Sequence, residues 1–161
     1  MVEDSQTSPE KQLLLQKIYI KDFSFESPRA PAVFASNVSP ETRLNIQSTA
    51  KELAPDTQEV ILSLTVEAKD QENTLFLVEI KQAGLFRIQG YSAKERRMLI
   101  GSYCPGALYP FAREAIADIV MRGGFPQFLL QPINFDGLYA QAVKDRGENN
   151  GESAPTREST H

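Results

Sequence analysis

The chain has 161 residues, a length typical of one domain, and its 41% apolar and 24% charged residues are ordinary for a globular protein. The formal net charge of −4 argues against sequence-independent binding of nucleic acid and against docking on anionic lipid. Cys104 is the only cysteine and His161 the only histidine. These counts exclude an internal disulfide, a Ser/His/Asp triad, a Cys/His pair and an ordinary zinc site.

The chain lacks an apolar run of membrane-spanning length, and the first residues are acidic around a short apolar patch at 13–15, unlike a signal peptide. We therefore expect a soluble, cytoplasmic protein. Residues 1–14 are polar and are expected to be flexible. Residues 146–161 are rich in Gly, Glu, Asn and Ser and are expected to be a disordered tail, which leaves residues 15–145 as the folded domain.

Four segments carry apolar residues at alternating positions and predict strands, at about 17–26, 43–47, 59–68 and 74–90. In the first, the alternation slips after Ile20, which predicts either a bulge near Lys21 and Asp22 or apolar cover on both faces. The last two are joined by the polar residues 69–73 and predict a long antiparallel hairpin, in which Gly84 marks a bulge or a close approach.

Pro28 and Pro31 predict an extended crossover between the first two strands, without a helix. The helical part comes last. Ser92 and Glu95 have capping-box spacing before a short helix that ends at Gly101, and residues 107–122 predict a longer helix with Pro110 in its first turn. A final helix is expected after Asn134.

Strands followed by helices predict an α+β fold, with a four-stranded antiparallel sheet and helices packed on one face. The first and fourth strands are apolar on both sides, and few helices are available to cover them. The surplus apolar faces predict self-association, a groove for apolar ligands or peptides, or both. The pattern does not separate these alternatives.

Residues for chemistry are few, because neither a phosphate-binding GxxxxGK[ST] loop nor a GxGxxG motif is present. Asp22 and Glu26 would lie roughly 13 Å apart along a strand, too far for a paired acid and base. They form either a solvated acidic stripe or a docking face for a basic partner. Glu79 interrupts an apolar run on the face of Leu77, which suits an exposed surface, and Cys104 reads as a packed thiol.

Four stretches together resemble the SecB family of protein-export chaperones: YIKDFSFE followed by SPRAP, LFLVEIKQAGLF, YCPGALYPFARE and RGGFPQFLLQPINFDGLY. The resemblance covers about residues 15–145, which would thus be a SecB-like domain. It implies a cytosolic homotetramer, a dimer of dimers, of antiparallel four-stranded subunits. It further implies an ATP-independent chaperone, not an enzyme and without a cofactor, that holds unfolded precursors of exported proteins and delivers them to the SecA motor ATPase.

The resemblance also implies roles for individual residues, which fall into three sets. A SecA-binding face is carried to Asp22, Glu26, Leu77 and Glu79. An oligomer interface, where alteration disturbs assembly, is carried to Val78, Ile80 and Gln82. The client groove is carried to Phe34, Leu44, Ile46, Phe135, Leu138 and Tyr139. An apolar lining would bind extended segments without a sequence code, because the hydrophobic effect is not directional.

Two alternatives stay open beside the export chaperone. The same scaffold could serve one particular client, such as a toxin–antitoxin partner. A small-ligand carrier or an unrecognised enzyme is the other class, which the lack of a visible nucleophile-and-base pair disfavours.

Overall fold

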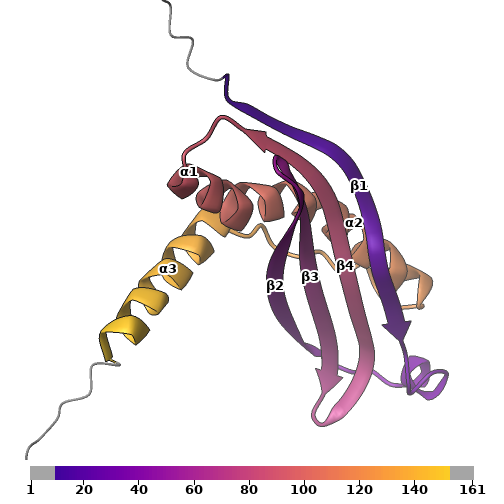
Figure 1. The fold of residues 1–161 in the computed structure, drawn as a ribbon. Helices are drawn as coiled ribbons and strands as arrows, with labels where there is room; N and C mark the ends of the chain where they lie inside the picture. The colour runs from indigo at the N-terminus through magenta and orange to yellow at the C-terminus, as the bar shows by residue number, and fades with distance from the viewer. Residues whose placement is uncertain (1–9, 153–161) are drawn as a thin grey trace, which may run out of the picture.

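The computed structural model describes residues 10–152. Residues 1–9 and 153–161, which hold most of the expected flexible start and much of the expected tail, lie outside the described residues. Four antiparallel strands form one sheet in the order β1-β4-β3-β2, as Figure 1 shows. Their bounds are Gln12–Glu26 for β1, Glu41–Ala54 for β2, Thr57–Asp70 for β3 and Asn73–Gln89 for β4.

Strand β1 contains two bulges along its pairing with β4. The register shifts between Leu15 and Lys17 and again between Ile20 and Asp22, so that Lys21 is the extra residue of the second bulge. The bulge predicted near Lys21 is therefore confirmed. Because each bulge changes the alternation by one residue, both Ile18 before it and Phe23 after it pack against the core.

The hairpin between β3 and β4 is tighter than the expected five-residue connection. Asp70 pairs with Asn73, which leaves Gln71 and Glu72 as the turn. Gln71 has φ of 54°, the left-handed conformation that such tight hairpin turns require.

One face of the sheet packs against helix α2, Cys104–Arg122, and we call this the covered face; the opposite face is the outer face. Alternate residues of β3 and β4, such as Leu62 and Ile80, point to the covered face and are almost fully buried. This period-two pattern confirms the α+β fold class. Gly84 lies where α2 comes closest: a Cβ there would be 2.9 Å from a Leu108 side-chain carbon.

The helical region differs from the expectation of two separate helices. Helix α1, Ala93–Met98, begins with the predicted capping box of Ser92 and Glu95, but the chain continues through a π-helical segment, Leu99–Tyr103, directly into α2. We call this segment the π-turn. Pro110 was predicted in the first turn of this helix, but it lies inside α2. The proline near the start of α2 is Pro105.

Three further predictions, about conformation, burial and a helix end, are corrected. Residues 32–35 form a short 3-10 turn within the crossover, which was expected to be wholly extended. Strand β2 was expected to be half-buried, yet every residue except Ile46 is exposed. Helix α3, Phe135–Glu152, runs past Arg146, where the tail was expected to begin. Asn134 does cap it, because its side chain accepts a hydrogen bond from the Gly137 amide at 3.0 Å.

Helix α3 projects away from the sheet and covers none of its central strands, as Figure 1 shows. Its main contact is with the π-turn. Within residues 10–152, no helix is both long enough and apolar enough to cross a membrane.

Replacing Gly84 with alanine tests the close approach between α2 and the sheet. The added Cβ would be 2.9 Å from side-chain atoms of both Leu108 and Phe86, so we expect the free energy of unfolding to fall by about 1–3 kcal/mol. Urea unfolding measures it. Gly147→Ala is the control, since no atom lies within 4 Å of its Cβ position. Equal stability of the two variants would contradict the packing described here.

Candidate functional site

The outer face brings together the four residues expected to bind SecA. Strand register places Glu26 opposite Leu77, Ser24 opposite Glu79 and Asp22 opposite Lys81, in alternate rows near the β3–β4 turn. Directly opposed residues of antiparallel strands share a face, so these side chains share the outer face. Asp22, Glu26 and Glu79 are exposed and Leu77 is half-buried.

Sequence reasoning missed Glu67, a fifth member of this group. Glu67 lies opposite Leu77 on β3, so that Leu77 has a carboxylate on both neighbouring strands, Glu26 and Glu67. The Glu67 carboxylate accepts a hydrogen bond from Thr74 at 2.9 Å and lies 3.4 Å from the Lys69 ammonium. The alternation of β3 could have placed it on this face. We call Asp22, Glu26, Glu67, Leu77 and Glu79 the acidic end.

A second polar group lies farther along the outer face, towards the β2–β3 turn. Tyr19 of β1 donates a hydrogen bond to Glu59 of β3 across the intervening strand, and Lys21 reaches the same carboxylate at 2.9 Å. Burial, together with Glu59, raises the pKa of Tyr19 to about 12. The hydrogen bonds from Tyr19 and Lys21 lower the pKa of Glu59. Three side chains thus tie β1 to β3.

The residues expected to affect oligomer assembly lie on the covered face. Val78, Ile80 and Gln82 are at most 3% exposed in the single chain, and the Gln82 side chain donates a hydrogen bond to the Tyr19 carbonyl at 3.2 Å. They fill the core of the subunit and offer no surface to a partner. Strand parity specifies a face and not what covers it, and within the single chain these expected interface residues occupy internal packing positions.

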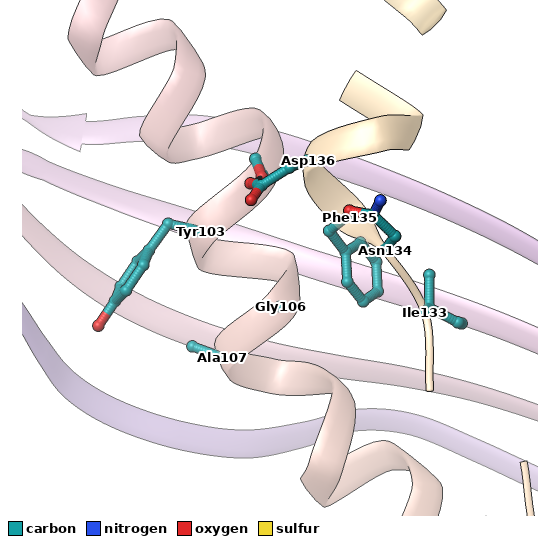
Figure 2. Close-up of a pocket in the computed structure, with 8 residues that line it drawn as sticks. Tyr103, Gly106, Ala107, Ile133, Asn134, Phe135 and Asp136 are labelled. Atoms are coloured by element: carbon teal, nitrogen blue, oxygen red, sulfur yellow. Dashed lines mark hydrogen bonds between the residues drawn. The ribbon is translucent and has the colours of Figure 1, made fainter. Parts of the chain in front are cut away.

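A channel with polar and apolar lining follows the connection from α2 to α3. A hollow of about 300 Å³ lies between β2, at Leu44, and residues 128–133. It adjoins a second hollow of about 410 Å³ through Ile133, and this one is bounded by the π-turn, α2 and the start of α3. Figure 2 shows Ile133 and Phe135 on one side of the second hollow. Tyr103 of the π-turn and Ala107 of α2 lie on the other side.

A third hollow, of about 620 Å³, continues between α3 and α1 and is lined mostly by apolar side chains, among them Met98, Leu99, Tyr139 and Val143. It shares Ser102, Tyr103 and Asp136 with the second. The three adjoining hollows together are the channel. Its connecting segment is held down by the Tyr109 hydroxyl, which donates to the Gln131 carbonyl.

The structure places the residues expected in the client groove unevenly. Leu44, Phe135 and Tyr139 line the channel. Phe34 lies outside it and packs against Phe125 in a tilted arrangement, with ring centroids 5.6 Å apart. Ile46 and Leu138 lie on the same elements as the lining but do not line it themselves.

Leu129, Ile133 and Tyr103 are channel residues that sequence reasoning missed. Leu129 is 62% exposed, which is high for so apolar a side chain. The proline-bracketed apolar run at 125–133 carried the signal, because such a run does not fit any predicted helix or strand.

Two other side chains, Cys104 and Arg96, have structural roles. Cys104 is fully buried, and burial raises the pKa of its thiol to about 12, so it is an inert packed thiol, as predicted. Arg96 donates to the carbonyls of Ile88 and Pro55 at 3.0 and 3.1 Å, and so fixes α1 to the end of the sheet.

Comparison with known proteins gives a consistent family. The sequence model described as "Preprotein translocase subunit SecB" matches residues 6–146. The chain is 49% identical over 144 residues to Protein-export protein SecB of Methylococcus capsulatus, covering 89% of this chain and 92% of that protein. It is 40% identical to the protein of the same name from Hahella chejuensis over the full length of both chains.

A solved structure shares the fold. A SecB-like chaperone of Mycobacterium tuberculosis, in complex with a ChAD peptide from the HigA1 antitoxin, superposes with a TM-score of 0.63 over 75% of this chain and 90% of that one. Its sequence identity to this chain is 18%, so the likeness concerns the fold.

Replacing Glu59 with glutamine tests the group that joins β1 to β3. Because folding lowers the pKa of Glu59 below 4.5, its contribution to stability is present above that pH and is lost as pH falls through the folded value. We expect Glu59→Gln to reduce the free energy of unfolding by about 1 kcal/mol at neutral pH, and the deficit to shrink at about pH 3. Urea unfolding at both pH values measures it, with Glu52→Gln as the exposed control. An equal deficit at both would contradict this.

Proposed function

The chain belongs to the SecB family, the chaperones of protein export. From this premise we propose which surface binds clients and which binds SecA. Unfolded precursors of exported proteins bind in the channel, and the SecA motor ATPase binds at the acidic end. The protein acts in the cytoplasm, without ATP or a cofactor, and prevents its clients from folding or aggregating before they reach SecA.

The observation that carries the client-binding proposal is the channel of three adjoining hollows. Apolar side chains line it while open to solvent, as at Leu129 and Leu44, which are 62% and 39% exposed. An extended apolar segment laid along it would remove both surfaces from water, at about 25 cal/mol per Å². The force requires no particular sequence, which suits a chaperone with many clients.

The acidic end supports the assignment of SecA binding. Its carboxylates surround the half-buried Leu77, so that long-range attraction for a basic surface is combined with an apolar contact at the centre. The channel runs on the other side of the molecule, bounded by β2 and the helices. Client and SecA could therefore be bound at the same time.

We propose that the chain assembles as a homotetramer, a dimer of dimers. Strands β1 and β2 form the edges of the sheet, and the edge groups of a long exposed strand are ready to pair with another chain. Large apolar side chains are also exposed along the helices, including Tyr103, Phe111 and Met121. Val78, Ile80 and Gln82 would influence assembly through the shape of the core beneath these surfaces.

A dedicated chaperone for one client, such as a toxin–antitoxin partner, is the second candidate. The antitoxin peptide in the structure of the mycobacterial SecB-like chaperone favours it. That protein is 18% identical to this chain, whereas relatives at 40–49% identity carry the name Protein-export protein SecB. Export is therefore the better-supported role.

Client binding is tested by size exclusion with light scattering, on the protein alone and with a reduced, unfolded precursor. We expect a mass near four subunits that rises only with the unfolded form. Leu129→Asp should raise the dissociation constant for the precursor by about tenfold or more, because binding would desolvate a carboxylate in an apolar site.

Leu53→Asp is the matched control, since Leu53 is 51% exposed on β2 but does not line the channel. It should bind the precursor as tightly as the unaltered protein. A monomer that ignores the precursor would overturn the proposal, and equal weakening by both variants would move the client site away from the channel.

The SecA assignment is tested by reversing one charge at the acidic end. Glu79→Lys should leave the oligomer intact, because Glu79 is exposed, and weaken binding of SecA roughly fivefold or more at low salt. Glu52→Lys makes the same charge change on exposed β2, far from the acidic end, and should have little effect. Titration of SecA measures both, and unchanged affinity of Glu79→Lys would refute the assignment.

A further inference from the structure

Helix α3 forms one wall of the channel but is attached at one end. Its main contact is with the π-turn, through its first two turns, and the rest of the helix projects outward (Figure 1). The second and third hollows share Ser102, Tyr103 and Asp136, which belong to this contact. Any change in the contact therefore changes the shape of both hollows.

The π-turn arises from a conflict between helix geometry and Pro105. In a regular α-helix, the ring of Pro105 would meet the carbonyl of Gly101, four residues earlier, and no amide would be available to bond it. The chain widens instead, and the Cys104 amide bonds to the Leu99 carbonyl, five residues back. Such insertions are frequent at functional sites.

The widened turn presents its backbone to the Tyr139 ring at Gly101. A Cβ at Gly101 would be 2.4 and 2.6 Å from two ring carbons of Tyr139, which real side chains do not tolerate. The ring of α3 therefore lies directly on the main chain of the π-turn, and glycine is the residue that permits it.

The next residue completes the contact by a hydrogen bond. Ser102 is 3% exposed, and its hydroxyl bonds to the carboxylate of Asp136 in the first turn of α3. Figure 2 shows the Asp136 side chain directed to this point of the π-turn. A carboxylate in the first turn also suits the helix dipole, so Asp136 stabilises both the start of α3 and its attachment.

We propose that the π-turn is the seat of α3, and that Gly101, Ser102 and Asp136 are positioning residues that set the angle of this channel wall. The seat combines one close packing contact with one hydrogen bond, so it fixes the start of α3 while the remainder can move with the client. The effect on clients rests on the proposed function; the seat itself does not.

The seat is tested first without any client, by hydrogen exchange of the α3 backbone amides in the full chain. Gly101→Ala should accelerate exchange in the first two turns of α3 by about tenfold, although alanine is the better helix former. Gly106→Ala is the matched control for seating, because its Cβ would lie an ordinary 3.7 Å from Phe135. It should leave exchange of α3 unchanged or slower. Equal exchange in the two variants would overturn the seat.

The hydrogen bond is tested by a double-mutant cycle on the same exchange rates. Ser102→Ala and Asp136→Ala should each speed exchange, Asp136→Ala more so because it also removes a charge that suits the helix dipole. The double variant should be little faster than Asp136→Ala alone, because Ser102→Ala removes only the shared hydrogen bond. Additive effects would show that the two residues act separately and would overturn the pairing. This readout also separates the pairing from the general effect of Asp136 on the helix dipole.

Client binding then shows whether the seat matters for function. With a labelled unfolded precursor, Gly101→Ala should release the client about three- to tenfold faster, since a wall that is not held in place contributes less to binding. Faster α3 exchange with unchanged release would keep the seat and overturn its role in the channel. If the unaltered protein fails to bind the precursor, the proposed function falls, while the exchange experiments still decide on the seat.

Discussion

The rest of the structure depends on one constraint: a single long helix covers one face of a four-stranded sheet. Alternation along β3 and β4 satisfies it, because every second residue, such as Leu64 or Val78, is buried against α2 and its neighbours. The outer face, the two edge strands and the far side of α2 then have no cover within the described chain. On the proposed function, clients, SecA and further copies of the chain bind these surfaces, so the exposed faces of the single subunit and its function have the same origin.

Period-two alternation is a strong signal in the sequence. It was enough to predict the sheet, the fold class and the bulge at Lys21. The π-turn was out of reach for a physical reason. Gly101 and Pro105 are ordinary helix-ending residues, and the continuous, widened helix is accompanied by tertiary contacts that the sequence does not reveal, namely Tyr139 on Gly101 and the burial of Cys104. Local propensity predicted a break, and tertiary contacts overrode it.

The candidate sites show the same division. The acidic end follows from parity alone, since Asp22, Glu26 and Glu79 must share a face once the strands are paired. The channel cannot be derived from strand parity, because residues 125–133 belong to no regular element. Their position depends on contacts such as the hydrogen bond from the Tyr109 hydroxyl to the Gln131 carbonyl. For that reason Leu129 was missed, and Phe34 was placed in a groove that it does not line.

The channel is built from three kinds of wall, which differ in how firmly they are held. Strand β2 is fixed by its ladder with β3, residues 128–133 by side-chain contacts, and α3 chiefly by its seat on the π-turn. A site for unrelated extended segments needs one rigid side to oppose the client and one side that adjusts to side chains of different size. On this proposal, a helix attached at one end supplies that adjustment, because beyond Phe135, which belongs to the core cluster, the main contact of α3 is with the π-turn and not with the sheet. On the proposed seat, Gly101 would therefore affect client binding although it touches no client.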